Sequence, residues 1–146
     1  MFKKFILAGI SLFLIVYAFI SAYLTPFPII DNISDSDIVV IRYNDGFEQG
    51  NYIENEITEF NEKEILRCIS KYDERRTLNK LYYGALGRSL NDFEIIVAVH
   101  ADKNIDNDLK LIYLGKDSYL DSGDDIKHII INDSDLRKEL KELILK

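Results

Sequence analysis

The chain has 146 residues, of which 47% are hydrophobic and 29% charged, a composition typical of a folded domain rather than of a disordered segment. Its single cysteine excludes an internal disulfide and a cysteine-based zinc site. The formal net charge of −7 argues against nucleic acid as a partner, because phosphate binding needs a basic face.

An apolar segment near the N-terminus predicts a membrane anchor. The uncharged run from Phe5 to Leu24 has 20 residues, and as a helix it would span about 30 Å, the thickness of the hydrocarbon core of a bilayer. Lys3 and Lys4 precede the run, whereas the first charges after it are acidic. The positive-inside rule therefore predicts a cytoplasmic N-terminus and an extracytoplasmic remainder. Because two prolines then end the helix, we expect the anchor to occupy residues 1–28.

Two alternatives to the anchor remain open. The segment could be a cleaved signal peptide with a weak cleavage site at Ile20–Ala22, and the domain would then be secreted. The run is longer than the roughly 7–15 residues typical of a signal-peptide core, which favours the anchor. Lipoprotein processing is excluded because no cysteine closely follows the run. The other alternative is a helix buried in a soluble core.

Beyond the anchor we predict a short stalk at residues 29–34 and an extracytoplasmic domain at residues 35–146. A domain of that length can bury a core without disulfides. The chain beyond the apolar run carries 16 basic and 25 acidic side chains. We therefore expect an acidic surface.

The first part of this domain predicts two strands and a helix. Ile38–Tyr43 is short, apolar and β-branched, which predicts a strand, and a turn separates it from a weaker strand at Tyr52–Ile57. An amphipathic helix is expected next, with Asn61 as its N-cap and Glu64 as the capping-box partner. Its apolar stripe ends near residues 73–76.

The second part predicts four more strands and a closing helix. The pattern at Phe93–Ala101 is apolar on both faces, which predicts a central strand with Phe93, Ile95, Val97 and Val99 on one face. Short turns then require an antiparallel meander through Leu109–Leu114, Ser118–Leu120 and Ile126–Ile131. The last helix follows an Asp133–Ser134 cap and would bury Leu136, Leu140, Leu143 and Ile144. Between the two parts, residues 77–91 fit a loose helical turn that two glycines weaken.

This order of elements predicts an α+β fold. We expect one N-terminal transmembrane helix, followed by a small domain with an antiparallel sheet of about five or six strands and two helices packed on one face.

The acidic loop at residues 102–108 resembles the start of a calcium loop, because oxygen side chains alternate along it. The match then fails, since Asn107 stands where the turn needs glycine and Tyr113 stands where a bidentate glutamate is needed. We therefore interpret the loop as a polar connection between two strands and expect no metal site.

Catalytic side chains are sparse. The two histidines, His100 and His128, lie in strand patterns, and an acid–base role would require them to meet beside a carboxylate. Cys68 lies beside the apolar stripe of the first helix and is expected to be a packed free thiol. The sequence contains no glycine-rich phosphate loop, serine-hydrolase elbow or zinc-protease helix. We predict no catalytic residue and no cofactor.

One group of side chains is a candidate interaction site. Arginines and tyrosines are common at protein interfaces, and several lie close together in an otherwise acidic domain. The alternative is a helix C-terminus whose cations interact with the helix dipole. The group consists of Tyr72, Arg75, Arg76, Tyr82, Tyr83 and Arg88.

The chain also resembles the small extracytoplasmic domains of low-GC Gram-positive bacteria that follow an N-terminal anchor or a lipoprotein signal. That family has no assigned chemistry, so the resemblance implies a location and no functional residues. It covers most of residues 38–145. The matching segments are the helix opening Asn61–Ile65, Arg76–Thr77, the strands at Phe93–Ala101 and Leu109–Leu114, Asp117–Leu120 and the closing helix.

Three functions fit these observations. The first is a membrane-tethered extracytoplasmic interaction module without catalysis, whose partner would be another extracytoplasmic protein. The second is an immunity or inhibitor protein against a secreted toxin or hydrolase, since its acidic charge would steer it towards a basic partner. The third is a small envelope enzyme that uses His100 or His128.

Overall fold

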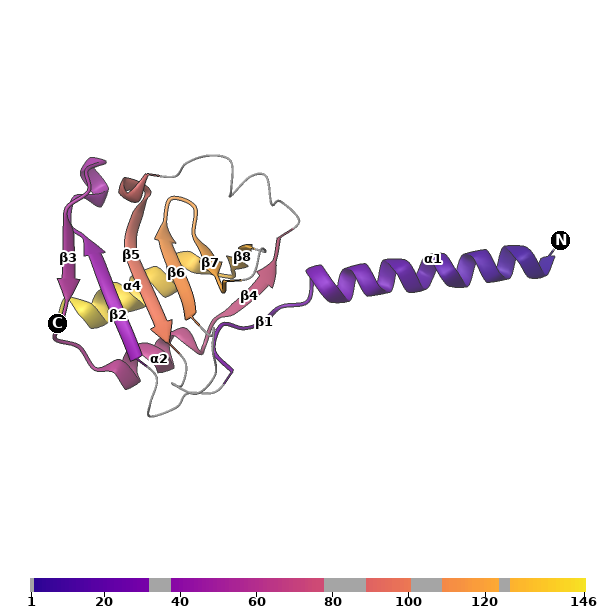
Figure 1. The fold of residues 1–146 in the computed structure, drawn as a ribbon, viewed down its shortest axis with the longest axis horizontal. Helices are drawn as coiled ribbons and strands as arrows, with labels where there is room; N and C mark the ends of the chain where they lie inside the picture. Colours follow the sequence, from indigo (N-terminus) through magenta and orange to yellow (C-terminus); the bar gives the residue numbers. More distant parts are fainter. Residues whose placement is uncertain (1, 32–37, 78–88, 101–108, 124–126) are drawn as a thin grey trace.

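The protein consists of one long helix joined to an α+β domain (Figure 1). We analysed a computed structural model of the whole chain. The described residues are 2–31, 38–77, 89–100, 109–123 and 127–146.

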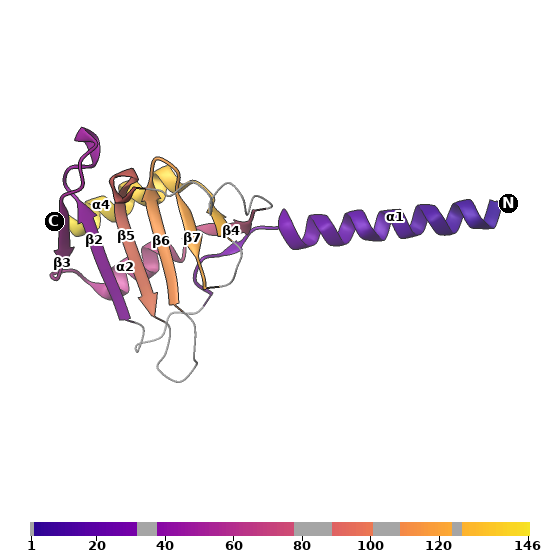
Figure 2. The same ribbon diagram turned by 45° about the horizontal axis from the view of Figure 1, so that its top comes forward.

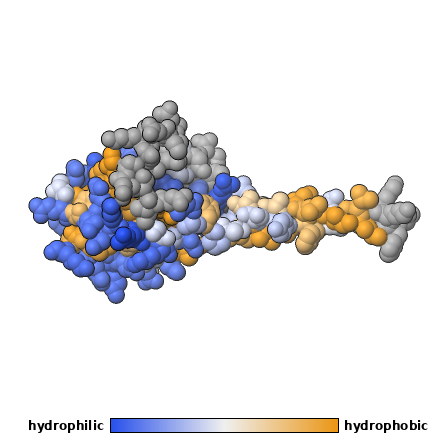
Figure 3. Space-filling model, turned by 90° about the horizontal axis from the view of Figure 1, so that it is seen from below, coloured by the Kyte–Doolittle hydropathy of each residue, from blue (hydrophilic) through white to orange (hydrophobic). Residues whose placement is uncertain are grey.

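The long helix α1, Phe2–Tyr23, projects away from the domain. Its segment from Ile6 to Tyr23 is long and apolar enough to cross a membrane, and none of that segment is buried in the protein. Figure 3 shows this hydrophobic surface along α1 beside a mainly hydrophilic domain face. The helix is therefore compatible with a membrane anchor or with a signal sequence. It ends before Pro26, which lacks the main-chain N–H that a helix needs.

The domain contains one antiparallel sheet in the order β1-β4-β8-β7-β6-β5-β2-β3. The α+β prediction is confirmed, but the sheet has eight strands rather than five or six. The strands are β1 (Phe27–Pro28), β2 (Ile38–Asn44), β3 (Glu54–Ile57), β4 (Asp73–Arg76), β5 (Phe93–His100), β6 (Leu109–Gly115), β7 (Tyr119–Asp121) and β8 (Lys127–Ile130).

The two additional strands are β1 and β4. We predicted that residues 73–76 would end a helix, and the alternative for Arg75 and Arg76 placed them at a helix C-terminus; that placement is wrong, because they belong to β4. This strand has four charged side chains, so its own sequence carries no strand pattern. It forms because β1 and β8 pair with it on either side. Long-range pairing overrides local preference here.

The predicted stalk also differs from the structure. Ile29 is fully buried in the core, and its N–H donates to the carbonyl of Tyr72 at 3.0 Å. With β1 in the sheet, the folded domain begins at Phe27, not at residue 35. The rest of the predicted stalk, residues 32–34, lies outside the described residues.

The predicted meander is confirmed. Strands β5 to β8 are neighbours in sequence order, and β5 lies in the interior of the sheet between β6 and β2. One detail is wrong. A β-bulge between Phe93 and Ile95 turns Phe93 to the other face, where its ring packs 5.2 Å from that of Tyr113 and 5.8 Å from that of Tyr119.

Two helices cover one face of the sheet, as predicted (Figures 1 and 2). Helix α2, Glu62–Ile69, begins at the predicted cap, since the side chain of Asn61 accepts from the main-chain N–H groups of Lys63 and Glu64. Helix α4, Asp133–Ile144, is capped one position earlier than predicted. Its N-cap is Asn132, which adopts a left-handed conformation with φ of 56°. Asparagine tolerates that region better than most residues.

The core lies between this helix pair and the sheet. The face of the sheet that α2 and α4 cover is termed the helix face, and the opposite face is termed the second face. Short 3-10 turns, η1 (Phe47–Gln49) and η2 (Leu90–Asp92), precede β3 and β5. Fully buried core side chains include Ile29, Ile41, Ile69, Ile95, Val97, Ile112, Leu114, Leu120, Leu136 and Leu140.

Candidate functional site

The structure does not gather the described members of the predicted interaction group into one patch. Arg75 and Arg76 are exposed but consecutive in β4, so their side chains leave opposite faces of the sheet. Tyr72 precedes the strand, and its hydroxyl donates to Oε1 of Glu139 on α4 at 3.0 Å. The remaining members, Tyr82, Tyr83 and Arg88, lie outside the described residues.

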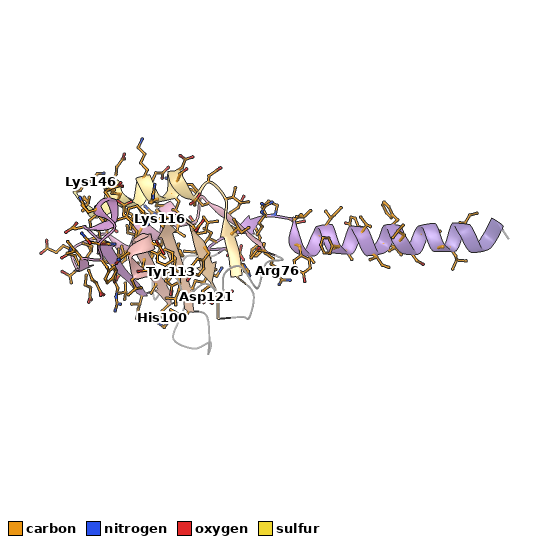
Figure 4. All side chains as sticks on the ribbon, turned by 90° about the horizontal axis from the view of Figure 1, so that it is seen from above. Arg76, His100, Tyr113, Lys116, Asp121 and Lys146 are labelled. Carbon is orange, nitrogen blue, oxygen red and sulfur yellow. The ribbon has the colours of Figure 1, made fainter. Side chains whose placement is uncertain are left out.

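The two histidines lie on opposite faces of the sheet. His100 is exposed at the end of β5 and follows Val99, which belongs to the core, so its side chain is on the second face. Figure 4 shows His100 on the side of the sheet away from α4. His128 is buried on β8 opposite the core residue Leu120. Strands β6 and β7 separate the two, so they form no joint acid–base site.

His128 belongs to a buried polar cluster that contacts the segment following α1. The carboxylate of Glu74, 1% exposed, lies 3.1 Å from Nδ1 of His128 and 3.1 Å from Nζ of Lys110. Lys110 also donates to the carbonyl of Ile29, and the ring of Phe27 meets His128 edge-on at 5.6 Å. Both carboxylate oxygens are therefore engaged within the chain. We assign this cluster a structural role, which is to fasten the segment after α1 to the sheet.

A second cluster joins α2 to α4 around Glu139. The buried thiol of Cys68 donates to Oε2 of Glu139 at 3.6 Å, and Lys71 Nζ lies 3.1 Å from the same oxygen. Burial and the Glu139 carboxylate raise the pKa of Cys68 to about 12. Hydrogen bonds from Lys71 and Tyr72 lower the pKa of Glu139. A thiol that stays protonated is a poor nucleophile, so the predicted packed cysteine fits this environment.

The third cluster was not predicted from the sequence. The bulge in β5 places Glu94, 4% exposed, against α4, where Lys141 forms an ion pair with it and Nε of Arg137 lies 3.6 Å away. The hydrogen bond to Glu94 raises the pKa of Lys141. One signal was present, since Glu94 is the only charged side chain in the apolar run of β5. Its partners come more than 40 residues later in the chain, on α4.

A groove of about 510 Å³ lies where β2 begins and β3 ends. Apolar side chains from both strands line it together with the chain that enters α2, and its charged lining residues are Glu56, Glu62 and Lys63. The lining residues are Val39, Val40, Glu56, Ile57, Thr58, Phe60, Asn61, Glu62 and Lys63.

A metal site is not found in the part of the chain that the structure describes, where no three histidine, cysteine or acidic side chains gather closely enough to hold an ion. The calcium-loop pattern at residues 102–108 lies outside that part.

Comparison with known proteins adds no family to this description. The chain matched none of the protein-family models, none of the curated proteins and none of the solved structures with which it was compared.

Proposed function

We propose that the protein is an interaction module held at a membrane by α1, with its domain on the extracytoplasmic side. One observation carries the proposal: the apolar helix continues directly into the edge of the sheet. Only three residues separate the end of α1 at Tyr23 from β1, and Ile29 is already buried. A helix that crosses a bilayer would therefore hold the domain close to its surface.

The charge distribution supports the orientation. Lys3 and Lys4 precede the apolar run, and all 25 acidic residues follow it. Basic flanks remain in the cytoplasm by the positive-inside rule. The small extracytoplasmic domains of low-GC Gram-positive bacteria that the sequence resembles would have the same arrangement, and membership of that family is part of the proposal.

The polar clusters support binding rather than catalysis. The acidic side chains of Glu74, Glu94 and Glu139 each hold cations from another element of the chain. Each cluster thus stabilises the contact between two elements, and the surface is left for contact with a partner. An immunity or inhibitor protein would be one form of such a module, with a basic toxin or hydrolase as the partner.

The test uses the full chain with a C-terminal tag, expressed in a Gram-positive host. We expect an intact chain in the membrane fraction that resists carbonate extraction, and a domain that added protease digests on protoplasts. The variant Phe13→Arg/Leu14→Arg places two charges in the middle of α1 and should lose the membrane fraction. A shortened chain in the medium would instead indicate a cleaved signal peptide, and a tag protected from protease would reverse the orientation.

A further inference from the structure

The sheet has one edge that no described strand covers. Strand β3 ends the strand order, and among the described residues only β2 pairs with it. The other edge is β1, which continues into α1, so β3 lies at the end of the sheet furthest from the anchor (Figures 1 and 2). An edge of this kind presents main-chain groups with which an extended chain can pair.

The register shows which groups point outward. Asp45 N–H donates to the carbonyl of Ile53 at 3.2 Å, so Ile53 directs its main chain towards β2. Orientation alternates along a strand, and therefore the N–H and C=O groups of Glu54 and Glu56 point away from the sheet. These two residues supply the hydrogen-bonding positions of the free edge.

The side chains of this edge form two rows of different chemistry. Glu54 and Glu56 are exposed and lie on the second face, where Arg42 on β2 reaches Glu54 Oε1 at 3.1 Å. The helix-face row has an apolar side chain at each end: Ile53 is 53% exposed, and Ile57 lines the groove described above. Between them lies Asn55, whose side-chain amide donates to Oδ2 of Asp45 at 2.6 Å. Arg42 can balance one of the two carboxylates, which leaves a negative charge on this edge.

We propose that β3 accepts an extended basic segment of another protein as an added strand. Lysine or arginine at alternate positions would lie beside Glu54 and Glu56, and the apolar residues between them would extend the row of Ile53 and Ile57 towards the groove. This inference rests on the proposed function, because it names the partner surface of the tethered module. The position furthest from α1 keeps this surface away from the membrane.

A second copy of the chain fits this edge poorly. Two β3 strands paired antiparallel would place Glu54 of one copy opposite Glu56 of the other, in both cross-strand pairs. Like charges directly opposite each other destabilise a pair of strands. Acidic side chains on an edge strand thus oppose self-pairing, while they attract a basic segment.

The probe is a fluorescent nine-residue peptide of alternating lysine and valine with blocked ends. It is titrated against the full chain in phosphatidylcholine nanodiscs, with empty nanodiscs as the blank. We expect saturable binding that weakens as salt rises. Methylation of the lysine main-chain nitrogens should abolish binding, because those N–H groups would face β3. Methylation of the valine nitrogens should leave it, because those groups would face solvent.

Three variants separate charge from main-chain pairing. Glu54→Gln/Glu56→Gln should weaken binding by about fivefold or more, whereas Glu48→Gln/Glu59→Gln removes the same charge from exposed positions off the strand and should change it less than twofold. Glu56→Pro removes one outward N–H and no bond to β2, a place where edge strands tolerate proline. We expect it to abolish binding while circular dichroism stays that of the wild type.

Several results would overturn the inference. Equal binding of both methylated peptides, or equal loss in the two double-glutamine variants, would reduce the effect to general charge attraction. A disulfide-linked dimer of Asn55→Cys in nanodiscs would assign the edge to a second copy, because position 55 of one copy would face position 55 of the other in that pairing. Absence of peptide binding by a chain that resists carbonate extraction would refute this inference alone, whereas release of the chain from the membrane would refute the tether whatever the peptide does.

Discussion

The ammonium group of Lys110 lies 3.1 Å from Oε1 of Glu74, although β7 and β8 separate the strands that carry them. The pair therefore crosses the helix face from the interior of the sheet to its anchor-side edge. Because Lys110 also donates to the carbonyl of Ile29, one side chain links β4, the strand next to the edge strand β1, to the segment that follows α1. The stability of this junction should depend on the Glu74 carboxylate.

Replacing Glu74 with leucine tests that dependence. The change leaves the cation of Lys110 and the buried ring of His128 without their carboxylate, so we expect a loss of about 3 kcal/mol or more in the free energy of unfolding. Urea denaturation of the full chain in detergent, followed by near-ultraviolet circular dichroism of the tyrosines, measures it. The exposed Glu142→Leu on α4 is the control and should cost less than about 0.5 kcal/mol. Similar costs for the two variants would contradict the role of the cluster.

Helix α4 and its C-cap residue offer a pair of leucines for comparison. Leu140 is fully buried and Leu145 is 54% exposed. Leu140→Asp buries a charge without a partner and should cost several kcal/mol, about 4 or more, whereas Leu145→Asp should be close to neutral. The same denaturation experiment reports both. A stable Leu140→Asp variant would show that α4 does not dock on the sheet.

The buried environment of Cys68 should make the stability of the domain fall at alkaline pH. Its thiol stays protonated in the folded chain up to a pKa of about 12, whereas in the unfolded chain it ionises near its ordinary value of 9.0. The unfolded state therefore releases its proton first, and the stabilisation is complete below pH 9 and is lost as pH rises from 9 towards 12. The slope that this group contributes approaches about 1.4 kcal/mol per pH unit.

Cys68→Ala should lack that contribution, so its stability should fall less steeply than that of the wild type between pH 9 and 10.5. Urea midpoints at half-unit steps of pH give the comparison. Parallel pH curves for the two proteins would mean that the thiol titrates normally in the folded state.

Gly115, at the end of β6, lies very close to the main chain at the start of β5. A Cβ atom at Gly115 would lie 2.0 Å from the carbonyl oxygen of Asp92, a main-chain atom that cannot move aside freely. Gly115→Ala should therefore displace the start of β5 and cost about 2 kcal/mol or more. Gly50 has a φ of 71° but open space around it, so Gly50→Ala should cost only about 1 kcal/mol. Equal melting temperatures for the two variants would contradict the predicted difference.

Local signals predicted the elements that form from their own residues. The Asn61 cap, the apolar pattern of β5 and the buried stripe of α4 each depend on residues within a single helix or strand. The features that the sequence did not predict depend on pairing between strands rather than on a local pattern. Strand β4 is charged throughout and exists because β1 and β8 flank it, and Phe93 changes face because a bulge shifts the register. Neither event leaves a periodic pattern in the sequence.

The free edge at β3 was likewise predictable only in part. The alternation of Glu54 and Glu56 with less polar residues is visible in the sequence, and a weak strand was predicted there. Its position at the free end of the sheet depends on β2 pairing with β5, whose paired residues lie 52 to 62 positions further along the chain. The buried positions of Glu74 and Glu94 depend likewise on partners from distant strands and from α4.

The strands run crosswise to α1, and the anchor and the free strand lie at opposite ends of the sheet (Figure 1). A mechanical pull between a bilayer and a partner on β3 would therefore act across the strands and load one pair after another, as in unzipping, rather than shearing many hydrogen bonds at once. The shortest ladders in that line are β1 with β4 and β7 with β8, each of which has two residue pairs. Because the ladder of β1 with β4 lies next to the anchor, it would bear the load first, and the hydrogen bond from Lys110 to the carbonyl of Ile29 reinforces it.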